Sequence, residues 1–302
     1  MIDAVIINWN SGELLSKSVG SILQNDAKNL VSNIIVVDNA SCDESMLHLP
    51  DVKKITRVKN LQNLGFARAC NQGFKLTSSP YVLLLNPDAM VYENTLSACV
   101  HFMETHPDID ILGCQLLNEY GKVSPSCARF PKPYRYFFHA IGLTRILPAI
   151  FHPPTLMTDW DHQSSDSVDQ VMGAFMFMRR SVFDRIGFFD ERFFVYYEEL
   201  DFSLRLKKSG GKTYFNSKIQ AMHSGGGTTN SVVGFRLFLS LQSRLRYARK
   251  HFSTLGFWVV FLSTWLIEPW VRLMLLLFTR RIKEISSLLE GYTRLLKASW
   301  LE

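Results

Sequence analysis

Short apolar runs alternate with amphipathic stretches along the first part of the chain. Residues 13–24 and 67–76 carry apolar side chains at helical spacing, and Ser11 is a plausible N-cap of the first helix. The apolar runs around these stretches predict buried strands at Met1–Ile7, Asn33–Val37, Lys54–Val58 and Tyr81–Leu85. The order strand, helix, strand, strand, helix, strand predicts a parallel sheet with right-handed crossovers, which is a nucleotide-binding type of fold.

The pattern continues less regularly in the second part. Predicted strands lie at Ile109–Leu117, Val171–Met178, Thr213–Phe215 and Ile219–Met222, and predicted helices at Asn94–Thr105, Ser181–Ile186 and Leu200–Lys208. Residues 125–170 are rich in proline, aromatic and basic residues, which indicates a long functional loop or a pair of short helices on a membrane. We expect one α/β domain at residues 1–232.

The C-terminal segment, residues 233–302, has a different character. The apolar run Leu255–Phe278 is interrupted by Glu268, Pro269 and Arg272. A membrane-spanning helix needs about 20 apolar residues and tolerates charges at mid-span poorly. We therefore expect one or two interfacial helices with tryptophan side chains among the lipid headgroups. A re-entrant hairpin and a pair of helices that forms a dimer are the alternatives.

The net charge of +6 belongs to this C-terminal segment. Residues 235–302 carry eleven Lys or Arg and four Glu, and the rest of the chain carries 22 basic and 23 acidic residues. A nucleic-acid-binding protein more often spreads basic residues over its folded face, so we expect a membrane surface as a partner and no nucleic acid. The five cysteines form no close pair and no signal peptide precedes the first strand, so we expect reduced thiols in the cytosol.

Acidic residues follow two of the predicted strands. Asp88 comes after Tyr81–Leu85 and the turn residues Asn86 and Pro87. Open α/β sheets bind ligands at the carboxyl ends of their strands, and a carboxylate there suits Mg²⁺ or Mn²⁺, which would hold a diphosphate. Asp38 ends its strand in the same way, where an acid can bind a ribose or base. The alternatives are a solvated turn for Asp88 and an N-cap or Asx-turn for Asp38.

A cluster of polar residues and glycines lies between these two acids: Asn63, Gly65, Arg68, Asn71 and Gly73. Because glycine lets the backbone approach a ligand closely, the cluster indicates a ligand-binding loop; an ordinary helix start is the alternative. The sequence contains no G-x-G-x-x-G and no G-x-x-x-x-G-K-[ST] motif, which argues against an NAD-dependent enzyme and a P-loop NTPase.

A third group of acids, Glu198, Glu199 and Asp201, lies at the start of a predicted helix. Three acids within four residues indicate a bound cation or a catalytic task, such as that of a general base near an acceptor hydroxyl. The alternative is the usual enrichment of acids in a first helical turn. We expect Asp201 to pair with Arg205 along this helix. His223, at a strand end before a glycine-rich loop, is either a ligand of phosphate or metal or a structural histidine.

Together these residues resemble the inverting glycosyltransferases of family 2, and in particular their bacterial rhamnosyltransferase-like branch. The resemblance covers about residues 2–230 and consists of Ile7–Asn10, Val37–Ser41, Asn63-x-Gly65-Phe66 with Asn71 and Gly73, Leu85–Asp88, Gly173–Phe175, Phe189–Asp201 and His223. It implies a GT-A fold, which is a Rossmann-like, mostly parallel sheet flanked by helices. It also implies a nucleotide-sugar-binding half at residues 1–120 and an acceptor-binding half at 121–232. Residues 233–302 lie outside the resemblance, and their basic and apolar pattern predicts a helical membrane-associating tail.

The resemblance further implies a nucleotide-sugar donor and a divalent metal, Mg²⁺ or Mn²⁺. The implied nucleotide-sugar-binding residues are Asn8, Asp38, Asn63, Gly65, Asn71, Asn86 and Asp88. Asp88 would bind the metal, and His223 would join it or the diphosphate. Asn86 stands in place of the first acid of the family's D-x-D motif, which removes one negative charge from the metal site.

On the acceptor side, the resemblance implies that Gly173, Ala174 and Glu198 border the acceptor. Glu199 stands where the family usually has the aspartate of its base motif and is longer by one methylene. The catalytic base is therefore expected among Glu199, Asp201 and Glu198, with Glu199 first.

The implied activity is transfer of L-rhamnose from dTDP-L-rhamnose, with inversion, to a polyprenyl-diphosphate-linked glycan of O-antigen or other polysaccharide assembly. The implied location is the cytoplasmic face of the bacterial inner membrane. A UDP- or GDP-sugar is an alternative donor. A sugar nucleotidyltransferase usually has a glycine-rich loop with Arg and Lys after its first strand, which residues 8–13 lack. A non-catalytic sugar-nucleotide binder is a further alternative, and the acids around Glu199 argue against it.

Overall fold

The computed structural model describes residues 1–225 and 233–298, which form two compact units of three stretches each. The sheet unit comprises Met1–Ala128, Trp160–Glu191 and Glu198–Thr228, and the helical unit comprises Arg129–Asp159, Arg192–Tyr197 and Thr229–Glu302. The expected boundary at residue 232 lies outside the described residues. Residues 129–159, which we expected in the acceptor-binding half, pack with the C-terminal helices instead.

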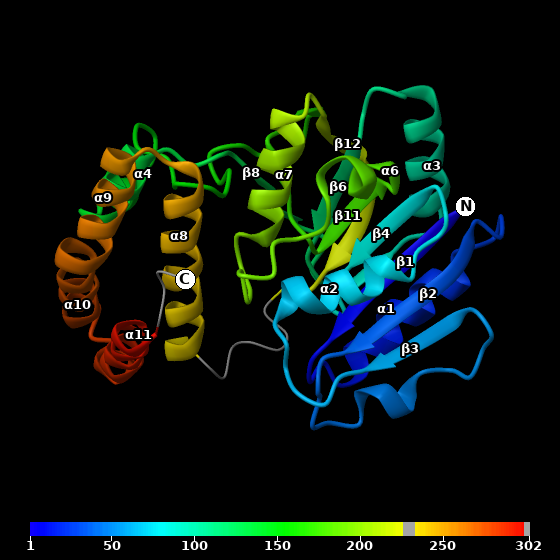
Figure 1. Ribbon diagram of the computed structural model, residues 1–302, viewed down its shortest axis with the longest axis horizontal. Coiled ribbons are helices and arrows are strands. Elements are labelled where there is room, and N and C mark those ends of the chain that lie inside the picture. The colour runs from blue at the N-terminus through cyan, green and yellow to red at the C-terminus, as the bar shows by residue number, and fades with distance from the viewer. Residues whose placement is uncertain (226–232, 299–302) are drawn as a thin grey trace. The chain divides into compact units, whose positions relative to one another are not determined.

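A mixed, mostly parallel sheet forms the centre of the sheet unit (Figure 1). Within the described residues its main order is β3 (Ile55–Lys59), β2 (Val31–Asp38), β1 (Ile2–Asn8), β4 (Tyr81–Leu85), β11 (Phe175–Arg179), β6 (Ile111–Leu117), β12 (Thr213–His223) and β5 (Ala89–Val91). The first four strands are parallel, as predicted, and β6 is parallel to β12. Strand β11 is antiparallel to both β4 and β6. The short strands β7 (Val123–Ser124) and β9 (Asp166–Ser167) extend the sheet, and β8 (Cys127–Ala128) pairs with β10 (Gln170–Val171) apart from it.

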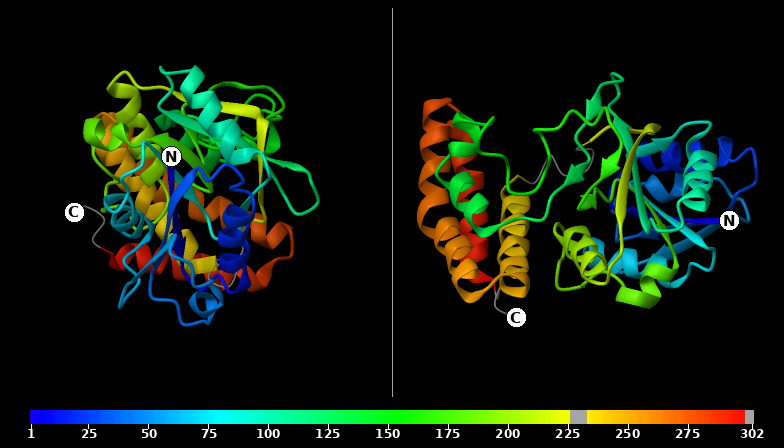
Figure 2. Two further views of the ribbon diagram at one scale, coloured as in Figure 1. Left: turned by 90° about the vertical axis from the view of Figure 1, so that its right-hand side faces the viewer. Right: turned by 90° about the horizontal axis from the view of Figure 1, so that it is seen from above.

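Helices cover both faces of the sheet because side chains alternate between the faces along each strand. Helices α1 (Glu13–Gln24) and α3 (Thr95–Thr105) and the 3₁₀ turn η1 (Ser45–His48) share one core with Ile2, Ala4 and Ile6 of β1. Helices α2 (Phe66–Lys75), α6 (Ser181–Ile186) and α7 (Glu198–Lys208) lie on the other side (Figure 2). There Phe74 of α2 packs against Phe183 of α6. Gly73 lets α2 approach the sheet, since a Cβ at this position would lie 2.4 Å from Val5 Cγ1.

Three local predictions were wrong. Ser11 is not an N-cap, because its hydroxyl donates a hydrogen bond to Asn8 Oδ1, and Gly12 precedes α1 without a side-chain cap. The apolar run at 171–178 is two strands rather than one, since β10 pairs with β8 and only β11 joins the main sheet. The two short strands predicted at 213–222 form one strand, β12, whose pairing with β6 shifts register between Asn216 and Gln220.

The helical unit has a core of its own. Its helices are α4 (Pro133–Ala140), α5 (Leu143–Ile146), α8 (Val233–His251), α9 (Thr254–Leu262), α10 (Glu268–Phe278) and α11 (Ile285–Lys297), with a π-helical turn η2 (Ser263–Ile267) and a 3₁₀ turn η3 (Ile282–Glu284). Helix α8 packs against α9 and α11, and α4 packs against α9. Buried side chains of α4, α8, α9 and α11 form one apolar cluster.

Helices α9 and α10 and the turn between them form one continuous helix, Thr254–Phe278. Pro269 lies inside this helix, directly after the π-helical turn η2, and the wider turn accommodates the proline ring and its missing backbone N–H. Glu268, which interrupts the apolar pattern in the sequence, is buried and accepts hydrogen bonds from Arg244 of α8 and Arg272. By length and composition alone, this is the one helix of the described residues that could cross a membrane.

Candidate active site

The candidate site begins at one edge of the sheet, where β1, β2 and β4 end. Asn8 and Asp38 are paired in the parallel register of β1 and β2, and Ile6 lies opposite Leu85 of β4. The last residues of these strands and the turn Asn86–Asp88 therefore lie at the same edge. This is the edge at which the sequence predicted ligand binding.

Asn8 positions Asp38 rather than facing outward. Its side chain is fully buried, and its Nδ2 atom donates to Asp38 Oδ1 at 2.9 Å, to Ser41 Oγ at 3.0 Å and to Ser45 Oγ at 2.8 Å. Asp38 Oδ1 also accepts a hydrogen bond from the backbone N–H of Ser41. Asp38 Oδ2 accepts no hydrogen bond within the described residues, so this oxygen is available to a nucleoside hydroxyl or base N–H.

An amide network shapes the loop that leads to α2. Asn39 Nδ2 donates to Asn63 Oδ1 at 2.8 Å, and Asn39 Oδ1 accepts from Asn60 Nδ2 and from the backbone of Leu64. Asn60 is in turn bonded to the side chain of Gln72 in both directions, at 2.8 and 2.9 Å. The sequence analysis missed the roles of Asn39, Asn60 and Gln72, because their partners lie 12 to 25 residues away in the chain.

Gly65 and Asn71 have different tasks in this part of the site. Gly65 precedes α2 with φ of 86°, a conformation that favours glycine. Asn71 is buried and clamps the backbone of Phe189: its Nδ2 donates to the carbonyl oxygen at 2.9 Å, and its Oδ1 accepts from the N–H at 3.0 Å. Asn71 Nδ2 also donates to Glu191. These contacts support the donor loop from behind.

Asp88 and His223 come together through the antiparallel pairing of β12 with β5. His223 lies opposite Ala89, and the Ser224 N–H donates to the carbonyl oxygen of Asp88. As a result, His223 Nε2 lies 3.3 Å from Asp88 Oδ1, and the two side chains are 14% and 11% exposed. Because these two residues are far apart in the chain, no local sequence pattern predicts that they pair.

These two side chains fit a divalent metal as a partial ligand set. Carboxylate oxygen and imidazole nitrogen both bind ions such as Mn²⁺. The part of the chain that the structure describes has no group of three or more His, Cys, Asp or Glu arranged to hold a metal. An ion held by Asp88 and His223 would therefore take its other ligands from a bound diphosphate and from water.

Glu199 faces the segment between β10 and β11. Gly173 has no side chain here, and a Cβ at this position would lie 2.5 Å from Glu199 Oε1. Burial raises the pKa of the Glu199 carboxyl above its ordinary value, although the backbone N–H groups of Glu199 and Gly173 and the Glu198 side chain oppose this shift. The carbonyl oxygen of Ala174 accepts from the N–H of Asn86, so this segment is bonded to the turn that carries Asp88.

Glu198 and Asp201 are more deeply buried than Glu199. Asp201 is fully buried, and its Oδ2 accepts a hydrogen bond from Arg205 Nε at 2.8 Å, as predicted for this pair. Arg205 also donates to the carbonyl oxygens of Ile186 and Phe188. Asp201 thus belongs to the packing of α7 against the loop after α6. Glu199 is the acid of this group that combines partial exposure with a raised pKa.

The fold and this site define the class of the protein as a GT-A glycosyltransferase. The GalNAc-T7 structure with UDP, GalNAc and Mn²⁺ aligns with a TM-score of 0.57 at 15% identity, over 82% of this chain and 47% of that chain. The chain thus spans about half of the length of GalNAc-T7. The mannosyltransferase PcManGT of Pyrobaculum calidifontis, in complex with GDP-Man and Mn²⁺, aligns with a TM-score of 0.55 at 14% identity, over 98% of this chain and 86% of that one.

The chain belongs to glycosyl transferase family 2, whose profile matches residues 3–187. The hexosyltransferase Agl10 of low-salt glycan biosynthesis in Haloferax volcanii is 25% identical over 264 residues, which are 83% of this chain and 76% of Agl10. N-acetylglucosaminyl-diphospho-decaprenol L-rhamnosyltransferase of Mycobacterium tuberculosis is 23% identical over 74% of this chain and 76% of its own. Rhamnosyltransferase WbbL of Escherichia coli K12 is 26% identical over 59% of this chain and 65% of WbbL. The expected family, fold and enzyme class are confirmed.

Proposed function

We propose that this glycosyltransferase moves L-rhamnose from dTDP-L-rhamnose, with inversion, to a polyprenyl-diphosphate-linked glycan of a cell-surface polysaccharide. The observation that carries the proposal is the position of three groups at one sheet edge. In this proposal Asp38 binds the nucleoside, and Asp88 with His223 binds the diphosphate. Glu199 lies against Gly173, in the segment whose Ala174 carbonyl oxygen is bonded to the Asn86 N–H of the Asp88 turn. Two of the relatives are rhamnosyltransferases by name.

The donor half of the site orders its residues before a ligand arrives. Asn8 fixes the orientation of Asp38 Oδ1, and the amide network holds the loop of Asn63 and Gly65. A site whose side chains are already held loses less conformational entropy on binding. A divalent ion at Asp88 and His223, when bound, would offset the charge of the nucleoside diphosphate leaving group.

Glu199 is the base in this proposal. A glutamate with a raised pKa takes a proton more readily than an ordinary one, and the hydroxyl of the acceptor is the group that must lose a proton. Gly173 leaves room for the Glu199 carboxylate itself, since a Cβ at position 173 would lie 2.5 Å from Oε1. The acceptor sugar is placed on this side.

The lipid part of the acceptor explains the surface of the helical unit. The helix Thr254–Phe278 exposes large apolar side chains at helical spacing, 45% to 89% exposed: Leu255, Trp258, Leu262, Leu266, Trp270, Met274, Leu277 and Phe278. Its other side is held to α8 by the ion pair between Glu268 and Arg244. We place this helix in the lipid interface rather than across the bilayer, because the charged Glu268 and Arg272 lie inside its apolar run. We place this face on the cytoplasmic side of the bacterial inner membrane.

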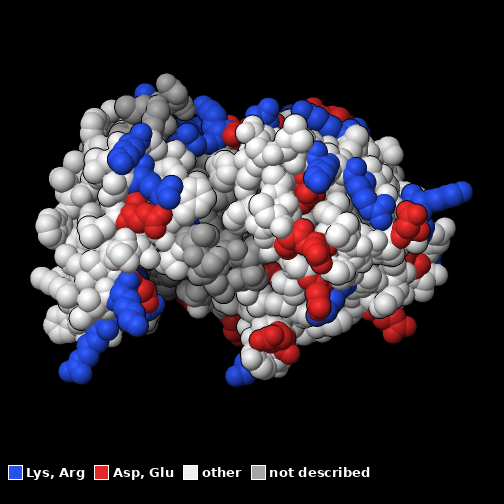
Figure 3. Space-filling model, turned by 90° about the horizontal axis from the view of Figure 1, so that it is seen from below, with Lys and Arg blue, Asp and Glu red and all other residues white. Residues whose placement is uncertain are grey.

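The charge distribution supports the proposed lipid surface. On the face drawn in Figure 3, Lys and Arg are interspersed with Asp and Glu, and large areas carry neither. Exposed Arg280, Arg281 and Lys283 follow the apolar helix directly. Cations at the end of an interfacial helix bind the headgroups of anionic lipids.

A different nucleotide sugar is the second candidate donor. The relative WfaP of Escherichia coli is named for UDP-Glc, and it is 28% identical over 35% of this chain. The described contacts of Asp38 are compatible with a ribose or deoxyribose and with several bases, so they do not distinguish dTDP from UDP or GDP.

A donor screen tests the proposal. Thermal melting of the full-length protein with dTDP-, UDP- and GDP-sugars, with and without Mn²⁺, should show the largest metal-dependent rise for dTDP-rhamnose, because a ligand at 100 times its Kd stabilises by about 2.7 kcal/mol. Transfer to a polyprenyl-diphosphate-linked GlcNAc should follow the same order. Asp88→Asn should melt like the wild type without ligand and lose the metal-dependent rise. A rise with a UDP- or GDP-sugar alone would favour the second candidate, and no response to any of them would contradict both.

A further inference from the structure

One face of α8 carries the segment Arg192–Tyr197, which ends one residue before Glu198. Ser243 Oγ donates to the carbonyl oxygen of Val195 at 2.8 Å, and Arg246 donates to the carbonyl oxygen of Arg192. Near the start of α8, Arg236 Nε donates to the hydroxyl of Tyr196 at 3.3 Å. All of these residues belong to the helical unit.

The same segment is strained where it leads toward the base. Tyr196 and Tyr197 have φ values of 68° and 71°, which non-glycine residues rarely adopt. Such conformations persist where the surrounding contacts hold them and are frequent at functional sites. Tyr197 is held by the Tyr136 hydroxyl at 3.0 Å, and its ring packs against that of Tyr247. Tyr196 has Arg236 as its partner.

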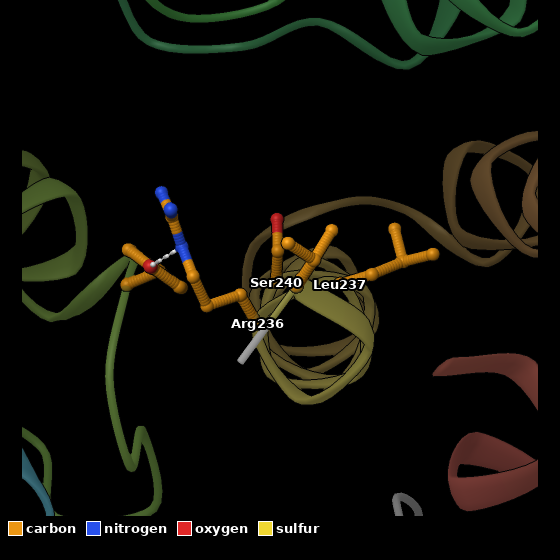
Figure 4. A pocket seen from close by; sticks show the side chains of 5 residues that line it. Arg236, Leu237 and Ser240 are labelled. Carbon is orange, nitrogen blue, oxygen red and sulfur yellow. Dashed lines mark hydrogen bonds between the residues drawn. The ribbon is translucent and has the colours of Figure 1, made fainter. Parts of the chain in front are cut away.

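A pocket of about 350 Å³ lies between Tyr196 and the first two turns of α8. Its lining residues are Tyr196, Val233, Arg236, Leu237 and Ser240. Figure 4 shows Arg236, Leu237 and Ser240 on one side of α8, with the Arg236 guanidinium bonded to the Tyr196 hydroxyl. Among the residues that the structure describes, the lining thus combines one guanidinium and two hydroxyl groups with two aliphatic side chains.

We propose that this pocket binds the diphosphate of the lipid-linked acceptor, with Arg236 as the main contact and the first lipid carbons against Val233 and Leu237. The proposal deepens the proposed function, since it assumes an acceptor of this class. A guanidinium matches phosphate oxygens in geometry and charge, and hydroxyl groups complete their hydrogen bonds. Aliphatic neighbours favour a phosphate that carries a lipid over free phosphate.

The pocket is connected to the proposed base through the chain itself. Tyr196 lies three residues before Glu199 in the sequence. A diphosphate on Arg236 and Tyr196 would fix the conformation of the segment that leads into α7 and its acids. Binding of the correct acceptor would then support the position of the base in addition to holding the acceptor.

A binding experiment on the full-length protein tests the pocket without any transfer. The probe is farnesyl diphosphate, with farnesol and inorganic diphosphate as comparisons. Wild type should bind farnesyl diphosphate more tightly than either comparison, Arg236→Gln should weaken this binding about 10- to 100-fold, and Arg236→Lys should weaken it less. The matched control is Arg249→Gln, an exposed arginine of the same helix, which should bind as wild type does. Binding that survives in Arg236→Gln and is lost in Asp88→Asn would place the probe at the donor site and overturn the proposal.

A transfer experiment separates this proposal from the proposed function. Arg236→Gln should raise the KM for a lipid-diphosphate-linked acceptor about 10- to 100-fold and leave the KM for the donor unchanged. For a simple alkyl glycoside with the same sugar and no diphosphate, the loss of kcat/KM in Arg236→Gln should be at least 10-fold smaller than the loss for the lipid-diphosphate-linked acceptor. Equal losses on both acceptors would overturn the role of Arg236. If the wild type transferred no sugar while farnesyl diphosphate binding still depended on Arg236, the proposed function would fail and the pocket would remain.

Discussion

Glu199 shows how one side chain can be prepared for proton transfer by its neighbours. Burial raises the pKa of its carboxyl, while the N–H groups of Glu199 and Gly173 and the Glu198 side chain limit the rise. Asp201, two residues on, is fully buried and bonded to Arg205. The two acids are close in sequence but have different surroundings, and this difference predicts different results on substitution.

Replacing Glu199 and Asp201 by their amides should separate catalysis from stability. Glu199→Gln should lower kcat about 10²- to 10⁴-fold with an unchanged melting temperature, because it removes a proton acceptor and keeps the side-chain shape. Asp201→Asn should lower the free energy of unfolding by about 1 to 3 kcal/mol, because it leaves the partly exposed Arg205 without its buried counter-charge. Steady-state kinetics and urea unfolding measure the two effects. Near-normal turnover of Glu199→Gln would move the base to Asp201.

The pH dependence of transfer should reflect the same carboxyl. A base must be deprotonated, so kcat should rise with pH and reach half of its plateau above 4.5, the ordinary glutamate pKa. Between 4.5 and the raised pKa, the unfolded chain binds fewer protons at this group than the folded chain does, so stability should fall as pH rises through this interval. Glu199→Gln should abolish this fall. A rate profile that reaches half of its plateau at or below 4.5 would argue against Glu199 as the base.

Gly173 is required by the position of the Glu199 carboxylate. In Gly173→Ala the new methyl would lie 2.5 Å from Oε1 and displace it, so kcat should fall about 100-fold, the usual effect of a misplacement of about 1 Å. Gly20→Ala is the control, because a Cβ in this helical position meets nothing within 4 Å. It should leave kcat unchanged and raise stability by about 0.5 to 1 kcal/mol.

At the scale of elements, Asn71 is the amide side chain of α2 that bonds this helix to the loop after α6. The family resemblance places Asn71 in the donor pocket, whereas the hydrogen bonds of its side chain within the described residues go to Phe189 and Glu191. Asn71→Ala should therefore lower the free energy of unfolding by about 1 to 3 kcal/mol, because it leaves backbone groups of Phe189 unpaired.

Donor affinity distinguishes this support from a direct donor contact. In Asn71→Ala, the Kd of the nucleotide sugar, measured by calorimetry, should stay within about twofold of the wild-type value. The control is Lys75→Ala, an exposed position of the same helix, which should change neither quantity. A large loss of donor affinity without loss of stability would restore the direct role.

The elements that the sequence predicts well are those whose signals are local. Strand β4 was predicted at both ends, because five apolar residues are followed by a turn that Pro87 imposes. The break between β10 and β11 was missed, because Val171–Met178 is apolar throughout and its division depends on β8, more than 40 residues earlier. The acids of the site were found as strand-end residues. The amides that hold them were not, since hydrogen bonds between distant residues leave no periodic pattern.

The C-terminal helix illustrates the same limit. Glu268 and Arg272 interrupt an apolar run, and the sequence predicted one or two interfacial helices without deciding between one and two. Arg244, 24 residues before Glu268, supplies the counter-charge that allows one continuous helix to form. The interfacial placement itself stays a prediction.

At the scale of the molecule, the apolar face of this helix should control membrane binding. Leu266 and Trp270 are 63% and 64% exposed, so glutamate at both positions should leave the helical core intact. Membrane partitioning should fall at least 10-fold, because a large apolar side chain contributes about 1.5 to 3 kcal/mol when it is buried in lipid. The control is Leu61→Glu, at a position that is 99% exposed in the sheet unit. Flotation with anionic vesicles measures the difference, and equal flotation of both variants would contradict the interfacial placement.

The division of each unit into three stretches limits how this enzyme can be cut or recombined. A chain that stopped at residue 228 would keep α4 and the segment Arg192–Tyr197 but lose the helices that bury Tyr136 and contact Tyr197. Exchange of the helical unit between relatives must therefore transfer three separate gene segments, because a single crossover at the carboxyl side would join mismatched cores. Chimeras made at one junction should be insoluble, whereas three-segment chimeras should carry over acceptor preference as a whole.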